Sequence, residues 1–79
     1  MKTIEQVKED LRKEGFENDD IVYTTEDFLK AVKTGFFNSY DGIGYYHDGE
    51  NETDISVFSG EISFTEAVKK YPYVCWYNK

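Results

Sequence analysis

The feature that most constrains the fold is a stretch of alternating apolar and polar residues between Tyr40 and Phe58. This alternation is typical of β-strands, because successive side chains of a strand point to opposite faces. The stretch contains no lysine or arginine. We therefore expect an antiparallel β-hairpin in the middle of the chain, and its register decides which side chains share a face.

Two registers of this hairpin are worth comparing. With a five-residue loop over 48–52, the apolar residues of both strands lie on one face. The predicted pairs are Ile43 with Val57, Tyr45 with Ile55, and His47 with Thr53. The opposite face then carries Tyr46, Asp54 and Ser56. A four-residue loop would instead pair Ile43 with Phe58 on the acidic side, so we prefer the five-residue loop, which Phe58 fits poorly.

Three segments have the periodicity and the terminal residues of amphipathic helices. Their predicted starts and stops are Thr3 and Gly15, Thr24 or Thr25 and Gly35, and Ser63 and Pro72. Their apolar stripes are Ile4, Val7 and Leu11; Phe28, Leu29 and Val32; and Phe64, Ala67, Val68 and Tyr71. Gln6 follows Thr3 by three residues, as a capping box requires, and a short extended piece over 21–23 precedes the second helix.

A final segment, Tyr73–Tyr77, contains only apolar or aromatic residues, which is typical of a strand with both faces at least partly covered. We place it beside one hairpin strand, which gives the order α-α-β-β-α-β. The expected fold class is a small α+β domain, in which the hairpin and the C-terminal strand form an antiparallel sheet with helices packed on one face. At 79 residues the chain makes one domain, residues 1–79.

The charge of the chain is concentrated in its middle. Between Thr34 and Val68 there is no lysine or arginine, and the acidic residues there are Asp41, Asp48, Glu50, Glu52, Asp54, Glu61 and Glu66. The two ends hold nine acidic and all nine basic residues, so the net charge of -7 comes from the hairpin and its flanks. Nucleic acid and anionic membranes repel such a protein, so we expect a basic protein surface as its partner.

No catalytic or cofactor signature is present, and two weaker patterns have simpler explanations. Cys75 and His47 are residue types of a nucleophile and its base, but burial in an apolar strand quenches a thiol, so we predict a packed core cysteine. We expect the acidic neighbours of His47 to raise its pKa. Asp48, Glu50 and Glu52 have the first spacings of a calcium loop, which then lacks the required Gly and the final Glu. We predict no enzyme, no cofactor and no metal.

The N-terminal segment and the cysteine content indicate a cytoplasmic protein. The chain is charged from Lys2 onward and shows no apolar run typical of a secretory signal or a membrane span. One cysteine cannot form an internal disulfide, which fits a reducing compartment.

The acidic hairpin is the candidate binding surface. Glu50, Glu52 and Asp54 are two apart, so in an extended segment they project to one side at about 7 Å intervals, as regularly spaced charges do along a nucleic-acid backbone. The predicted partner-binding residues are Asp41, Tyr45, Tyr46, Asp48, Glu50, Glu52, Asp54 and Glu61. The polar connector 17–20 supplies Glu17, Asp19 and Asp20 if it lies nearby. The alternative is a solvated face that serves solubility alone.

By size and charge alone, the chain is similar to small acidic inhibitors of phages and mobile elements, such as anti-CRISPR and anti-restriction proteins, some of which are nucleic-acid mimics. We expect a non-enzymatic protein that blocks a basic, nucleic-acid-binding surface of a partner enzyme or complex. The alternatives are an immunity protein that neutralises a toxin enzyme and a small structural or assembly subunit. The protein is expected to be a monomer, or a homodimer through Tyr73–Tyr77 if that strand is an exposed edge.

Overall fold

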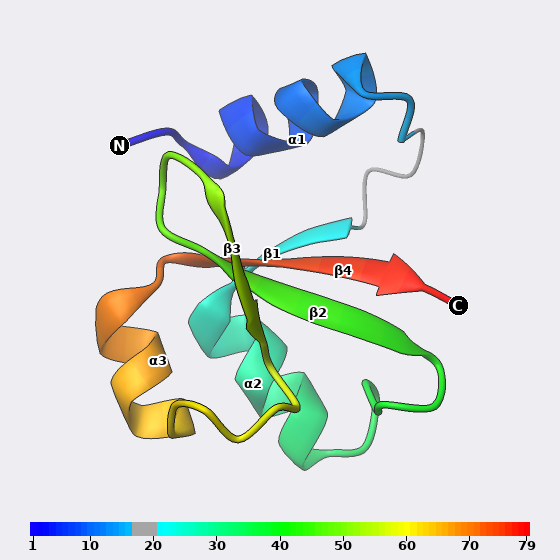
Figure 1. Cartoon of the computed structure of the whole chain (residues 1–79), viewed down its shortest axis with the longest axis vertical. Coiled ribbons are helices and arrows are strands. Elements are labelled where there is room, and N and C mark those ends of the chain that lie inside the picture. The colour runs from blue at the N-terminus through cyan, green and yellow to red at the C-terminus, as the bar shows by residue number, and fades with distance from the viewer. Residues whose placement is uncertain (17–20) are drawn as a thin grey trace.

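The computed structural model describes residues 1–16 and 21–79, which form three helices and one four-stranded antiparallel sheet (Figure 1). The elements are α1 (Ile4–Lys13), β1 (Val22–Thr24), α2 (Thr25–Lys33), β2 (Gly42–His47), β3 (Glu52–Ser56), α3 (Phe64–Lys70) and β4 (Tyr73–Asn78). The α+β class and the predicted element order are confirmed. The short extended piece before the second helix is strand β1, which joins the sheet.

Each helix begins at a hydroxyl side chain that caps its first turn. The Thr3 hydroxyl accepts a hydrogen bond from the Gln6 N–H, and the Gln6 side chain accepts one from the Thr3 N–H, which completes the predicted capping box. Thr24 and Ser63 accept the corresponding backbone bonds in α2 and α3. After α1 the chain turns at Gly15, whose φ of 101° favours glycine.

The C-terminal strand lies inside the sheet, whose order is β1-β4-β2-β3. Cys75 of β4 faces Val22 of β1 on one side and Tyr45 of β2 on the other. The predicted pairing of this strand with one hairpin strand is therefore confirmed. The condition for a homodimer through Tyr73–Tyr77, that this strand is an exposed edge, is not met, because both edges of β4 are already hydrogen-bonded.

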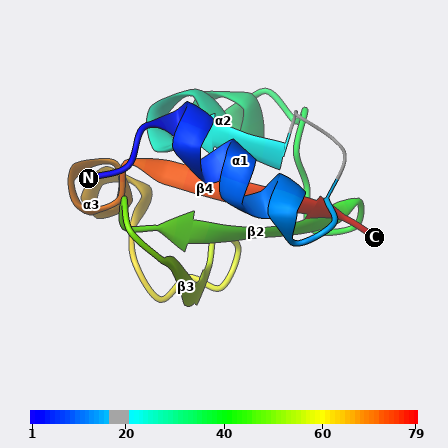
Figure 2. The same cartoon turned by 90° about the horizontal axis from the view of Figure 1, so that it is seen from above.

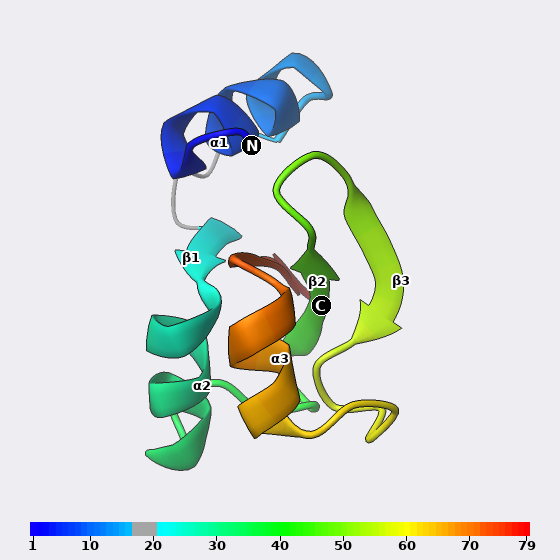
Figure 3. The ribbon, with the colours of Figure 1, turned by 90° about the vertical axis from the view of Figure 1, so that its left-hand side faces the viewer.

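The helices cover both faces of the sheet, not one face as the sequence predicted. Val74 and Trp76 of β4 pack with α2 and α3, whereas Cys75 packs with Val7 and Leu11 of α1 on the opposite face. Figure 3 shows α1 on one side of the sheet and α2 and α3 on the other. The physical reason is that β4 is apolar on both faces, and each face gains stability when a helix removes it from water.

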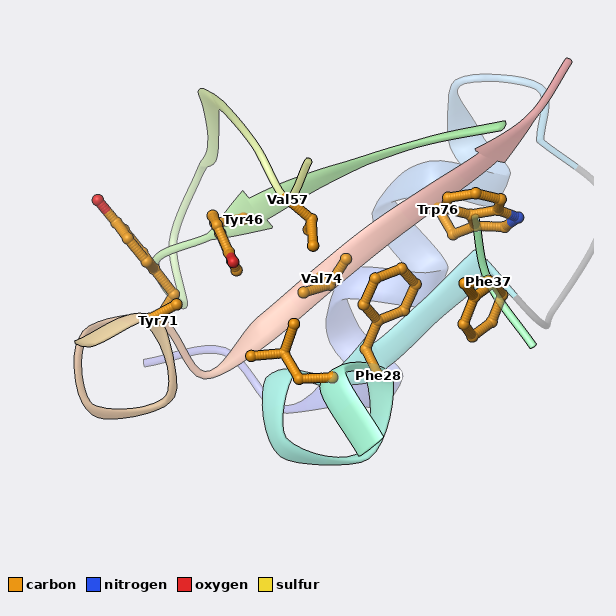
Figure 4. Packing of buried hydrophobic residues seen from close by; sticks show 9 residues of the cluster. Phe28, Phe37, Tyr46, Val57, Tyr71, Val74 and Trp76 are labelled. Atoms are coloured by element: carbon orange, nitrogen blue, oxygen red, sulfur yellow. The ribbon is translucent and has the colours of Figure 1, made fainter. Parts of the chain in front are cut away.

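The larger core is aromatic and lies between the sheet and the helix pair α2 and α3 (Figure 4). The Phe28 and Phe37 rings stack with centroids 4.4 Å apart, and Trp76 lies 4.9 Å from Phe37. The Tyr46 and Tyr71 rings stack at 5.2 Å. Aromatic pairs at these separations add to the free energy of burial, so this core fixes the position of β2 and β4.

The hairpin follows neither predicted register over its whole length. Tyr45 faces Ser56, which is the offset of the four-residue loop, whereas His47 faces Glu52. The register therefore shifts between Tyr45 and His47, so β3 carries additional residues at the tip of the hairpin. The preferred five-residue loop, with Tyr45 opposite Ile55, is wrong.

Compared with the preferred predicted register, this shift changes which side chains of the two hairpin strands share a face. The Thr53 hydroxyl donates a 2.8 Å hydrogen bond to the Tyr46 carbonyl, a contact made by a side chain at the irregular position. Val57, whose N–H bonds the Gly44 carbonyl, packs with Tyr46 in the aromatic core, and Ile55 packs against the same core. The predicted face that joined Ile55 and Val57 to Tyr45 is therefore wrong, because a slip of one residue turns every side chain over.

Among the described residues, no helix combines the length and the apolar character needed to cross a bilayer.

Candidate protein-binding surface

Three exposed carboxylates, those of Asp48, Glu50 and Glu52, lie at the turn between β2 and β3, and we call them the acidic tip. The Asp48 carboxylate accepts hydrogen bonds from the N–H groups of Asn51 (2.7 Å) and Glu50 (2.8 Å). These bonds shape the turn and lower the pKa of Asp48. The Glu50 carboxylate lies 3.1 Å from the amino group of Met1.

The acidic tip faces α1 across a cleft of about 410 Å³. The charged residues of the cleft are Asp10, Lys13 and Glu14 of the α1 region, Lys2, and Glu50 and Glu52 of the tip. The Lys2 ammonium donates a 2.7 Å hydrogen bond to Asp10, which lowers the pKa of Asp10 and raises that of Lys2. Of the described side chains that line the cleft, the carboxylates outnumber the ammonium groups by four to two. The cleft therefore extends the negative charge of the tip onto α1.

The inner wall of this cleft holds His47 and Cys75, which are both buried. The His47 Nδ1 accepts a 3.0 Å hydrogen bond from the Gly49 N–H. Burial lowers the pKa of His47 more than Asp48 and Glu52 raise it, so the predicted upward shift is wrong. Burial also raises the pKa of the Cys75 thiol to about 12, and the prediction of a packed core cysteine is confirmed.

Next to the cleft, α1 leaves part of the sheet uncovered. Figure 2 shows α1 crossing above β4, while β3 and much of β2 extend beyond it. Four apolar or aromatic side chains gather there, and we call them the open face: Phe16, Ile43, Tyr45 and Tyr77. Phe16 is 40% exposed and Ile43 is 37% exposed, and the Tyr77 ring centroid lies 5.3 Å from that of Phe16 and 6.4 Å from that of Tyr45.

One hydrogen bond joins the open face to the acidic tip. The Tyr77 hydroxyl donates to Glu52 Oε1 at 2.6 Å. Burial, together with this bond, raises the pKa of the Tyr77 phenol, so it stays a donor at neutral pH. The carboxylates and the aromatic rings are therefore neighbours on the α1 side of the sheet.

Five of the predicted binding residues lie on this side of the molecule: Tyr45, Asp48, Glu50, Glu52 and Asp54. Glu52 and Asp54 are two apart in β3, so they point to one face of the strand. The predicted regular row of three charges is wrong for Glu50, which lies in the turn before β3. The tip therefore presents a cluster of carboxylates and not an evenly spaced line.

Three predicted residues lie elsewhere. Asp41 directly precedes β2, and the tip follows the six residues of this strand, so about 20 Å of strand separates them. Glu61 lies in the connection between β3 and α3. Tyr46 is 0% exposed and stacks on Tyr71, so its ring belongs to the core and not to the surface. The predicted contributions of Glu17, Asp19 and Asp20 fall outside the described residues.

α1 and β4 supply a part of this surface that the sequence did not predict. Asp10, Glu14 and Phe16 belong to none of the sites predicted from the sequence, and Tyr77 was predicted only as part of a covered strand. Asp10 and Glu14 are four apart, so they lie on one side of the helix, and this spacing was the available signal.

The described residues contain no cluster of three or more His, Cys, Asp or Glu side chains with the geometry of a metal site. At the position of the calcium-like spacing, the Asp48 carboxylate accepts backbone bonds within its own turn.

Comparison of the chain with known proteins finds no matching protein family, no curated relative and no matching solved structure.

Proposed function

We propose that this protein is a non-enzymatic binding protein whose acidic tip and open face dock on a basic surface of another protein and block it. The observation that carries the proposal is the contact between Tyr77 and Glu52, which places half-buried and exposed aromatic rings beside a cleft whose carboxylates outnumber its lysines. Carboxylates speed the encounter with a basic surface, and buried rings hold the complex that results.

The open face supports this proposal better than charge alone. An acidic surface that serves solubility needs no apolar partner, whereas α1 leaves Ile43, Tyr45 and Phe16 accessible to solvent. Aromatic residues surrounded by polar ones are typical of the energetic centre of a protein–protein interface. The proposed arrangement is therefore an aromatic centre with a rim formed by Glu52, Asp54 and the cleft.

The partner class that we propose is a nucleic-acid-binding enzyme or complex. Proteins that contact phosphates present clustered lysines and arginines, which are the groups that the carboxylates of the tip would neutralise. The net charge of -7 repels nucleic acid itself, so the proposed contact is with the protein. An immunity protein against a toxin enzyme would use the same surface, and the identity of the captured partner distinguishes the two roles.

The test compares two charge-reversal variants of equal net charge. The first carries Glu50→Lys and Glu52→Lys in the tip, and the matched control carries Asp41→Lys and Glu61→Lys, which lie away from it. The partner is captured from lysate of the host or its target cells with the wild-type chain, under washes of increasing salt. Association rates with the purified partner are then measured at low and high salt.

We expect the tip variant to associate at least about tenfold more slowly at low salt and the control to change by less than about twofold. Tyr45→Ala should leave association nearly unchanged and increase the dissociation rate. Equal slowing by both charge variants would mean that bulk charge alone acts, and the proposed surface would then be wrong.

A further inference from the structure

The face of the molecule opposite α1 carries a second surface of different chemistry. Between α2 and α3 lies a groove of about 310 Å³. Its apolar lining is Leu29 from α2 and Phe64 and Val68 from α3. Leu29 is buried and Phe64 is half-buried, whereas Val68 is 43% exposed. Figure 3 shows these two helices side by side beneath the sheet.

The rim of this groove is basic, although the chain as a whole is acidic. Lys30 and Lys33 of α2 and Lys69 of α3 line it, together with one carboxylate, Glu26. Glu26 already pairs with Lys30 at 3.2 Å. Lys33 and Lys69 make no ion pair with any described residue. The groove thus offers an apolar strip between unpaired positive charges.

We propose that this groove binds an acidic amphipathic helix of a partner protein. The apolar side of such a helix would cover Phe64 and Val68, and its carboxylates would lie against Lys33 and Lys69. The choice of an acidic helix as the bound segment therefore rests on charge complementarity. This inference goes beyond the proposed function and does not rest on it, because the acidic tip lies on the other side of the sheet.

The backbone around the groove favours a helix over an extended segment. An extended peptide gains most of its affinity by pairing its main chain with the free edge of a sheet. The backbone groups of α2 and α3 are bonded within their own helices, so they offer no such pairing. A helix forms its backbone hydrogen bonds internally, so the groove needs to provide only apolar contacts and positively charged side chains.

Nucleic acid fits the groove less well than an acidic helix does. The apolar strip of Leu29, Phe64 and Val68 gains nothing from contact with phosphates. In addition, a long polyanion would extend past the few lysines of the rim, and there the net charge of -7 repels it.

The test uses a lactam-bridged helical peptide of about 14 residues, with leucines along one face and glutamates on the other. It is titrated into the full chain, and backbone and methyl NMR signals are followed. We expect signal shifts centred on Phe64, Val68 and Lys69. The control peptide has the same composition with its leucines spread around the helix, and it should bind at least about tenfold more weakly.

Two variants of the chain test the contacts. Lys33→Glu with Lys69→Glu should weaken the peptide at least about tenfold, whereas the matched control, Lys8→Glu with Lys79→Glu, changes the same charge outside the groove and should change affinity by less than about twofold. Val68→Ser removes an exposed apolar side chain and should weaken binding without loss of folding. The Glu50→Lys, Glu52→Lys tip variant should bind the peptide as the wild type does.

Three results would overturn the inference. The first is the absence of shifts in the groove with peptide at about 1 mM. The second is self-association of the chain that is lost in the Lys33→Glu, Lys69→Glu variant, since the occupant would then be a second copy. The third is displacement of the peptide by a single-stranded oligonucleotide at equal charge concentration, which would make the groove a general anion surface.

Discussion

The Tyr77 hydroxyl donates a 2.6 Å hydrogen bond to Glu52, which lies 25 residues earlier in the sequence. This bond links the inner strand β4 to the first residue of the edge strand β3. Tyr77→Phe keeps the ring and removes this bond. We expect it to lower the free energy of unfolding by about 1 kcal/mol, measured by urea denaturation. The hydroxyl of Tyr45 makes no hydrogen bond with a described residue, so Tyr45→Phe is the control and should be near neutral; an equal effect of both changes would contradict the assignment.

The imidazole of His47 makes the stability of the fold depend on pH. Burial lowers its pKa below the usual 6.5, so the unfolded chain takes up a proton at higher pH than the folded chain does. The free energy of unfolding should therefore be highest above pH 6.5 and decrease as the pH falls below it, until folded His47 is itself protonated. A protonated Nδ1 also cannot accept the bond from Gly49. The measurement is chemical denaturation at a series of pH values.

The control for this pH dependence is His47→Asn. The asparagine Oδ1 stands where the His47 Nδ1 does, so it keeps an acceptor for the Gly49 N–H, and this side chain does not titrate. Its stability should be nearly flat between about pH 7 and 5. A wild-type slope that persists in this variant would assign the dependence to other groups. Protonation of Asp48 acts in the same direction at lower pH, because its pKa lies below the usual 3.8.

The phenol oxygen of Tyr46 is buried and has no hydrogen-bond partner among the described residues. Burial raises the pKa of this phenol, so the neutral hydroxyl is the form that is enclosed. Tyr46→Phe removes an unpaired polar atom while keeping the stack on Tyr71. We expect it to raise the free energy of unfolding by about 1 kcal/mol, detectable as a higher melting temperature. A decrease of similar size would show that the hydroxyl is paired in solution.

Gly42 begins β2 where the sheet leaves no room for a side chain. A Cβ atom at this position would collide with the Tyr77 carbonyl and with the Trp76 indole. Gly42→Ala should therefore destabilise the fold by about 1–3 kcal/mol, seen as an earlier midpoint of urea denaturation. The exposed Ser39, changed to Ala, is the control in the same region and should shift the midpoint little. An unchanged midpoint in Gly42→Ala would mean that the strand can move aside.

Local signals in the sequence were sufficient to predict the helices. Thr3, Thr24 and Ser63 each satisfy a free backbone N–H, and this chemistry depends on residues three positions away. The unbroken apolar run of β4 correctly predicted a strand covered on both faces. The prediction that the helices pack on one face was wrong, because the order of elements alone did not show that α1 would cover the second face.

The hairpin register could not be predicted because it depends on an irregular position. The alternation of apolar and polar residues predicts which face each side chain lies on only while the strand register is constant. The register shifts between Tyr45 and His47, so the alternation fails in this hairpin. The Thr53 hydroxyl contributes to this break through its bond to the Tyr46 carbonyl, which no pattern of polarity reveals. Tyr46 therefore lies in the core and not on the predicted acidic face, whereas Glu52 is exposed as predicted, and this changes the composition of the candidate surface.

The position of β4 has a consequence for how the protein is made. β1 and β2 do not pair with each other, and each pairs with Tyr73–Asn78, which comes last in sequence among the four strands of the sheet. Until those residues emerge, β1 has no strand to pair with and β2 can pair only with β3. The sheet is therefore complete only after β4 has been synthesised, and until then Phe28 and Phe37 lack their ring contacts with Trp76.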